Sequence, residues 1–169
     1  MFFVTFMTGQ PMLFQCATGE CNAKERLKNL MQGRTIHELK LGEKAEFTKT
    51  VSETDIYLFA GVTGDFNPAH VNEEYARKTL FGSRIAHGML TAGFISSVIG
   101  MGLPGPGTIY LDQTLKFLAP VRIGDTVTAR AEVVKIMSEE NRIKLRTTCV
   151  NQHGATVLEG EAVVSPRKS

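Results

Sequence analysis

Residues 61–70, GVTGDFNPAH, hold an acid and a histidine whose types and spacing could do chemistry. Asp65 and His70 are five positions apart, an offset that would splay their side chains on a continuous helix. Pro68 disfavours helical backbone at Asn67, so the segment is expected to be extended or turned. That bend could let both side chains hold one water, with the histidine taking its proton and the acid orienting it or relaying a proton. A capping aspartate and a surface histidine on a turn remain the plainer interpretation.

A second candidate is the segment AHGML at residues 86–90, where His87 and Gly88 stand at the entry to an apolar helix. The first N–H groups of a helix have no partner within it, and the helix dipole there favours negative charge. Glycine at this point lets a ligand carbonyl approach the backbone. The site could polarise a carbonyl and stabilise an enolate, or Gly88 could merely permit tight entry into the core.

Together these features indicate one reaction. A water held by an acid and a base, next to an oxyanion site, suits conjugate addition to an α,β-unsaturated thioester. Water attacks Cβ, the thioester oxygen becomes enolate-like, and a proton goes to Cα. The reverse reaction dehydrates a 3-hydroxyacyl thioester.

Helices are expected on both sides of the acid–histidine segment. Residues 52–62 suit a helix with Ser52 as N-cap and Asp55 as the reciprocal acid, and a short helical stretch is expected over 72–80. Residues 88–101 are apolar on nearly every face, which predicts a buried helix.

The last third of the chain predicts strands. Residues 126–134, TVTARAEVV, alternate between apolar and polar side chains almost without fault. We expect a four-strand antiparallel meander, with one further strand at 45–51 before it, wrapped around the buried helix. This α+β arrangement is the hot-dog fold. The four expected strands are 108–117, 126–134, 142–150 and 156–164.

Gln113 lies on the apolar face of the expected strand 108–117, where its amide must find hydrogen-bond partners. It is expected to brace the catalytic loop or a subunit contact, as structural support of the site. Asn67 and Pro68 support the site by supplying the bend.

Length and composition are those of a globular protein with one domain. The chain has 169 residues, 43% hydrophobic and 21% charged, with a formal net charge of +2. That charge gives no reason to expect nucleic acid or a membrane surface as a partner. No run reaches the ~18 apolar residues of a transmembrane helix.

The N-terminal region differs from the rest. Residues 1–30 lack clear periodicity and are expected to be a poorly ordered extension, with the domain over 31–169. The first basic residue is Lys24, so a secretory signal is not expected. The three cysteines are an odd and sparse set without the spacing of a zinc site, so we expect a reducing cytoplasm and no metal.

Three stretches resemble the MaoC-like, (R)-specific enoyl-CoA hydratases. FAGVTGDFNPAHVNEEYA at 59–76 looks like the signature of that family, and the match continues through RIAHGML and through residues 103–129. The resemblance covers roughly residues 34–165. It implies a hot-dog fold, usually dimeric, that acts without a cofactor on an acyl-CoA thioester, or on one carried by acyl carrier protein.

The resemblance also implies roles for single residues. Asp65 and His70 would activate the water, and the Gly88 amide would bind the thioester oxygen. By position, three further residues would line the acyl pocket, and the size of the last two suggests a short acyl chain: Ser96, Ile99 and Val163.

The leading hypothesis is an (R)-specific enoyl-CoA hydratase, equivalently a 3-hydroxyacyl-CoA dehydratase. A 3-hydroxyacyl-[acyl-carrier-protein] dehydratase keeps the chemistry and changes the carrier. A hot-dog thioesterase would release free thiol, and a non-catalytic acyl-binding protein would bind without turnover. The acid–histidine motif disfavours the last two.

Overall fold

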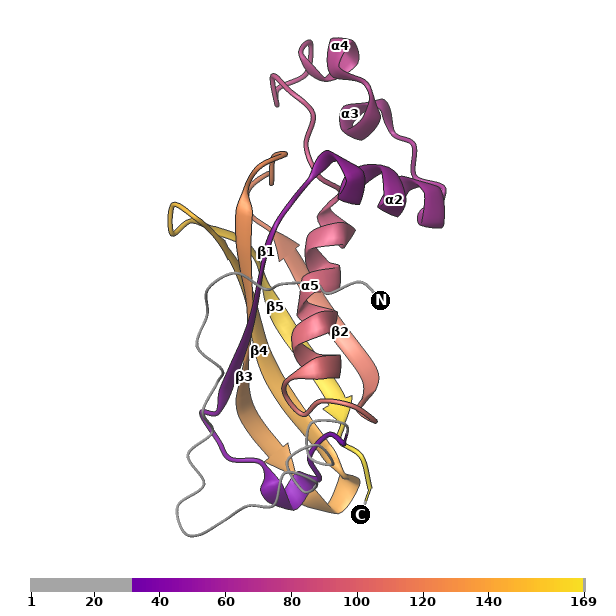
Figure 1. Cartoon of the computed structure of the whole chain (residues 1–169). Helices are drawn as coiled ribbons and strands as arrows, with labels where there is room; N and C mark the ends of the chain where they lie inside the picture. The colour runs from indigo at the N-terminus through magenta and orange to yellow at the C-terminus, as the bar shows by residue number, and fades with distance from the viewer. Residues whose placement is uncertain (1–31, 169) are drawn as a thin grey trace, which may run out of the picture.

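The computed structural model describes residues 32–168 as one curved antiparallel sheet with a long helix on its concave face (Figure 1). A set of short helices overhangs one end of the sheet. The helices are η1 (Ile36–Glu38), α2 (Glu53–Thr63), α3 (Pro68–Val71), α4 (Glu73–Ala76), α5 (Gly88–Met101) and η2 (Ser138–Glu140). The strands are β1 (Lys44–Thr50), β2 (Ile109–Phe117), β3 (Thr126–Met137), β4 (Arg142–Asn151) and β5 (Thr156–Ser165).

The predicted α+β hot-dog architecture is confirmed, with one correction to its topology. The strand order is β1-β3-β4-β5-β2, so only β3, β4 and β5 form the expected meander. β2 pairs with β5 at the far edge instead of forming a hairpin with β3. The connection after β2 does not form a hairpin to β3. It pairs instead with residues 85–86: the Ala86 N–H donates to the Val121 oxygen, and Arg122 forms an antiparallel β-bridge with Ile85.

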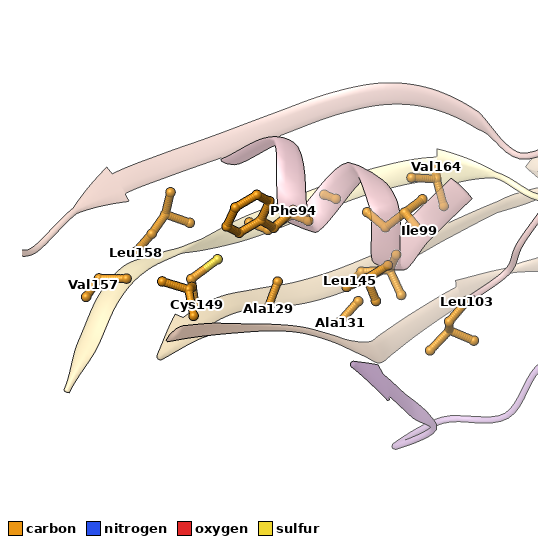
Figure 2. Packing of buried hydrophobic residues seen from close by; sticks show 14 of the residues in the cluster. Phe94, Ile99, Leu103, Ala129, Ala131, Leu145, Cys149, Val157, Leu158 and Val164 are labelled. Carbon is orange, nitrogen blue, oxygen red and sulfur yellow. The ribbon is translucent and has the colours of Figure 1, made fainter. Parts of the chain in front are cut away.

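The core lies between α5 and the sheet. Alternation along β3 is as predicted, since Val127, Ala129, Ala131 and Val133 are buried. Figure 2 shows Phe94 and Ile99 of α5 packed over the inner face of the strands. Each large side chain buried there contributes about 1.5–3 kcal/mol, so this packing fixes α5 against the sheet.

One face of α5 departs from the expectation of a fully buried helix. Met89, Gly93, Ser96 and Met101 are exposed, whereas the face toward β1 and β3 is buried. α5 therefore presents a solvent-facing stripe of small and flexible side chains.

Among residues 32–168, no helix has both the length and the apolar character to cross a membrane. The expectation for residues 1–30 lies outside the described residues.

Candidate active site

The bend predicted around Asn67 and Pro68 is present. α2 ends at Gly64, whose left-handed backbone (φ 77°) lets the chain turn sharply. The Asp65 carboxylate accepts from the Asn67 N–H at 3.2 Å, and the Asn67 side chain accepts from the Ala69 N–H at 3.0 Å. Asn67 thus caps α3, and Pro68 stands at its first position, where a missing N–H costs nothing.

His70 is held by a backbone carbonyl. Its Nδ1 lies 2.9 Å from the Ile85 oxygen, which can only accept, so Nδ1 carries the proton. The ring nitrogen Nε2 is left with its lone pair and can act as a base. In return the Ile85 N–H donates to the Ala69 oxygen at 3.3 Å, which fixes the two segments to each other.

The acid, the base and a second histidine meet at this point. One ligand atom from each of Asp65, His70 and His87 lies within 4.8 Å of the others. A water needs about 2.7–3.0 Å to each partner, so atoms at this separation can share one. The Asp65 side chain is exposed and His70 is partly buried, so a water can reach both. The structure therefore brings the predicted pair together.

His87 was given no role by the sequence interpretation. Its side chain is only 2% exposed, and its Nε2 lies 2.9 Å from the Asp65 backbone oxygen. Its ring stacks on that of His70 with centroids 3.9 Å apart, and Phe59 packs on it at 4.9 Å. The signal that could have found it is a polar ring between apolar residues at the start of a buried helix.

Gly88 is the first residue of α5 and is exposed. Within residues 32–168 its N–H has no hydrogen-bond partner, as expected for the first turn of a helix. A Cβ at this position would lie 2.7 Å from the Phe117 ring, so a side chain here would crowd the ring. Because His87 is bonded to Asp65, the neighbouring Gly88 stands beside the acid–histidine pair.

Arg84 fastens the overhanging helices to one another. Its guanidinium lies 2.6 Å from Glu53 and 3.1 Å from the Tyr57 hydroxyl on α2, and its backbone N–H donates to Glu73 of α4 at 3.2 Å. The hydrogen bond to Glu53 is the main reason why the pKa of Arg84 is raised. The next residue, Ile85, carries the carbonyl that orients His70.

Gln113 does not reach the catalytic loop. Its side chain accepts from the Tyr110 hydroxyl and donates to the Thr147 hydroxyl at 3.2 Å, on the inner face of β2 and β4. Burial raises the pKa of Tyr110 to about 12, so this hydroxyl remains a donor. The group braces the sheet, and the expected contact with the loop is not made.

Val163 does not face α5. It pairs with Lys144 on one side and Asp112 on the other, and its neighbours Ala162 and Val164 are the fully buried residues. Side chains alternate along a strand, so Val163 points to the outer face and cannot line a pocket under the helix.

Val164 occupies the inner position instead. Figure 2 labels both Val164 and Ile99 between α5 and the strands, and both side chains are buried. Ser96 lies on the exposed stripe of α5, open to a ligand. The structure thus keeps Ile99 and Val164 in the core and Ser96 at the surface.

The three site residues are also the kind that bind metals. An Asp and two His suit Zn²⁺. The His70 and His87 rings, however, are stacked at 3.9 Å with only 33° between their planes. A metal in the plane of one ring would lie well out of the plane of the other, so the geometry favours a water.

A cavity of about 590 Å³ lies at the other end of the sheet, beside η1 and η2.

Comparison with known proteins points in one direction. A family model described as "MaoC like domain" matches residues 37–155. The "(R)-specific enoyl-CoA hydratase" of Rhodospirillum rubrum is 59% identical over 129 residues, 76% of this chain and 89% of that protein. The "3-hydroxybutyryl-CoA dehydratase" of Methylorubrum extorquens is 48% identical over 79% of this chain and 85% of its own. The solved structure of R-hydratase PhaJ1 from Pseudomonas aeruginosa, unliganded, has a TM-score of 0.77 at 45% identity, covering 82% of this chain and 89% of its own.

Proposed function

The chain belongs to the MaoC-like dehydratase family, and we propose that it is an (R)-specific enoyl-CoA hydratase. It adds water reversibly across the double bond of a short-chain trans-2-enoyl-CoA, such as crotonyl-CoA, to give the (R)-3-hydroxyacyl-CoA. It is a hydro-lyase. The proposed reaction needs neither a metal nor an organic cofactor, because a base, an acid and an oxyanion donor suffice for it.

The reaction follows from the placement of three groups. A water lies between the Asp65 carboxylate and Nε2 of His70. His70 takes one proton from it as the water oxygen bonds to Cβ, and Asp65 orients the water. The electrons of the double bond move toward the thioester oxygen. The Gly88 N–H, at the N-terminus of α5, donates a hydrogen bond to this oxygen. The catalytic pair then returns a proton to Cα, so one water is added in all.

One observation carries the proposal: the Ile85 carbonyl fixes the proton of His70 on Nδ1 and leaves Nε2 as the base, on a ring that lies close to Asp65. General acid–base groups of this kind contribute about 10²–10⁴-fold each to a rate.

The test removes each group in turn. Asp65→Asn and His70→Ala are expected to lower kcat for crotonyl-CoA hydration by about 10³-fold or more, while the melting temperature changes little. The assay follows the loss of absorbance of the conjugated thioester, and chiral analysis of the product is expected to give the R isomer. Near-wild-type turnover in either variant would sink the assignment.

CoA is the carrier that we propose, with acyl carrier protein as the alternative. An acidic carrier protein would need free basic side chains, and three candidates for that contact each have a partner. Arg84 pairs with Glu53, Lys116 with Glu159, and Arg122 with the Phe81 carbonyl. Rates with crotonyl-CoA and with the crotonyl carrier protein separate the two, and release of free thiol would indicate a thioesterase instead.

Three further features belong to the proposal. We infer a homodimer from the edge strand β2, most of whose residues are exposed and whose first three residues are Ile109, Tyr110 and Leu111. Ile99 and Val164 fill the inner space beside α5, which supports a short acyl chain. The free buried thiol of Cys149 suits a reducing compartment, and we place the protein in the cytoplasm.

A further inference from the structure

We propose that His87 is a positioning residue that holds the catalytic pair in place, with its proton fixed on Nε2. This inference rests on the proposed function for the roles of Asp65 and His70. It gives His87 the task of holding the acid and the base in place, not of touching the substrate.

The hydrogen bond from His87 reaches the backbone of the acid itself. Its Nε2 lies 2.9 Å from the Asp65 carbonyl oxygen, and no other side chain within residues 32–168 bonds to that oxygen. Asp65 follows Gly64, the left-handed residue that ends α2. Glycine permits many backbone conformations, so Gly64 alone does not fix the direction of the chain after it. The bond from His87 therefore selects one path and ties the acid to the N-terminus of α5.

The hydrogen bonds assign opposite tautomers to the two histidines. The Asp65 oxygen only accepts, so Nε2 of His87 must carry the proton. Nδ1 of His87 is buried without a partner in the described residues, so a proton there would find no acceptor. His70 is the reverse, with the proton on Nδ1 facing the Ile85 carbonyl. Each ring is thus fixed by one backbone carbonyl.

The ring of His87 also supports the base. Its centroid lies 3.9 Å from that of the His70 ring and 4.9 Å from that of the Phe59 ring. Rotation of the His70 ring away from its bond to Ile85 would have to displace this stack. Because Phe59 comes from α2, the stack connects the helix before the catalytic loop with the one after it.

Two other uses of His87 are distinguishable from positioning. If it served only as core packing, an isosteric apolar ring would replace it without loss of rate. If it ligated a metal, both of its nitrogens would be required, one for the metal and one for the Asp65 carbonyl. The positioning role requires only the donor at Nε2.

The first test is spectroscopic and needs no substrate. The chain has four histidines, so a long-range ¹H–¹⁵N spectrum holds four ring patterns, assigned with single His→Gln variants. We expect His87 to show its proton on Nε2 and His70 to show its proton on Nδ1 at neutral pH. A proton on Nδ1 of His87, or exchange between both tautomers, overturns the proposal.

The second test separates the hydrogen bond from the ring. His87→Phe keeps the ring and loses the donor, whereas His87→Gln loses the ring and places an amide N–H near the same point. We expect His87→Phe to lower kcat about 10–100-fold with KM within about threefold of wild type, because a displaced acid costs rate more than binding. His87→Gln is expected to recover most of that loss.

His153→Gln is the matched control, since it makes the same change in the exposed turn between β4 and β5 and should leave kcat unchanged. Full activity in His87→Phe, or no recovery in His87→Gln, contradicts the proposal while the proposed function stands. Should the wild-type protein fail to hydrate crotonyl-CoA, the proposed function fails and the tautomer spectrum still tests His87. The spectrum also decides the matter if a variant does not fold.

Discussion

At the scale of single residues, the protons of the site are placed by backbone carbonyls. The Ile85 oxygen takes the proton of His70, and the Asp65 oxygen takes that of His87. A carbonyl does not titrate at ordinary pH, so it accepts a hydrogen bond from the ring N–H at any working pH. The base is thus oriented without a charged partner that would itself titrate.

Gly88 gives a prediction at this scale. In Gly88→Ala the new Cβ stands where the thioester oxygen must approach the backbone N–H, so kcat/KM for crotonyl-CoA is expected to fall about 100-fold. The ring atom that it would meet belongs to Phe117, which is half exposed and can rotate. The melting temperature should therefore drop by only a few degrees, as measured by calorimetry.

A double variant distinguishes blocked approach from a displaced ring. Phe117→Leu by itself should be nearly as active as wild type. If Gly88→Ala stays impaired when combined with it, the methyl group itself is the obstacle. Recovery in the double variant would show instead that only the ring was at fault, and the proposed oxyanion role of Gly88 would lose its support.

Cys149 is expected to be inert. It is fully buried, and burial raises the pKa of its thiol to about 12 because the thiolate would be poorly solvated. At pH 8 only about one molecule in ten thousand would carry the thiolate. After treatment of the native protein with iodoacetamide, peptide mass spectrometry should find Cys149 unmodified, and modified once urea is added. Labelling at equal rates in both conditions contradicts this.

The approach of Asp65 and His70 to each other could be predicted because it depends on local geometry. Pro68 and Asn67 dictate the bend within five residues, and the motif resembles a known signature. The place of His87 at the start of a buried helix could have marked the residue, but its hydrogen bond to Asp65 could not be predicted, because the two residues lie 22 positions apart. Val163 was the wrong choice by one position, since the phase of a strand decides which side chain faces inward.

At the scale of elements, α2 begins with a capping box that was predicted from Ser52 and Asp55 and is confirmed. Burial would raise the pKa of Asp55, but hydrogen bonds from the backbone N–H and hydroxyl of Ser52, together with Lys49, outweigh it, and the pKa is lowered. The cap matters to the site because α2 carries Phe59, which packs on His87.

Removal of this cap should cost stability in a pH-dependent way. Asp55→Ala is expected to lose about 1 kcal/mol at pH 7. Because the pKa is lower in the folded state, the contribution of Asp55 is fully present above its unfolded value of about 3.9 and is lost as pH falls through the folded value. Urea unfolding of both proteins at several pH values measures it. A gap between wild type and variant that stays constant below pH 4 would contradict the assignment.

Arg84 gives the second prediction for elements. In Arg84→Gln the overhanging segment loses its bonds to Glu53 and Tyr57, so amide exchange over residues 68–76 should become about tenfold faster and kcat should fall. Arg142→Gln is the control, since Arg142 pairs with the exposed Glu140 of η2, outside the overhanging helices, and a surface pair of this kind contributes at most about 1 kcal/mol. Equal exchange rates in wild type and Arg84→Gln would show that the clamp is unimportant.

The place of β2 could not be predicted from the pattern of its residues. Alternation identifies a strand but not its neighbour, and sequential strands usually pair. The deciding contacts are between the connection after β2 and residues 85–86, which lie more than thirty positions earlier in the chain. The same contacts hold Ile85 where His70 needs it, so the topology and the site are fixed together.

At the scale of the whole molecule, the two edges of the sheet differ. β1 pairs with β3 on one side, and its other edge is protected by the charged residues Lys44, Glu46 and Lys49. β2 exposes Ile109, Tyr110 and Leu111 at its start and Phe117 at its end. An unpaired apolar edge strand is a template for another strand, and a second copy of the chain offers an identical one.

The dimer prediction follows from this edge. Leu111 is 47% exposed in the single chain, so Leu111→Asp should be nearly neutral for a monomer but should place a buried charge in an interface formed by two β2 strands. Light scattering after size exclusion is expected to give a dimer for wild type and a monomer for Leu111→Asp. Leu41→Asp, a change at a 66% exposed leucine before β1, should remain dimeric. If Leu111→Asp keeps the mass of the wild type, the partner does not dock at β2, and the exposed stripe of α5 becomes the next surface to test.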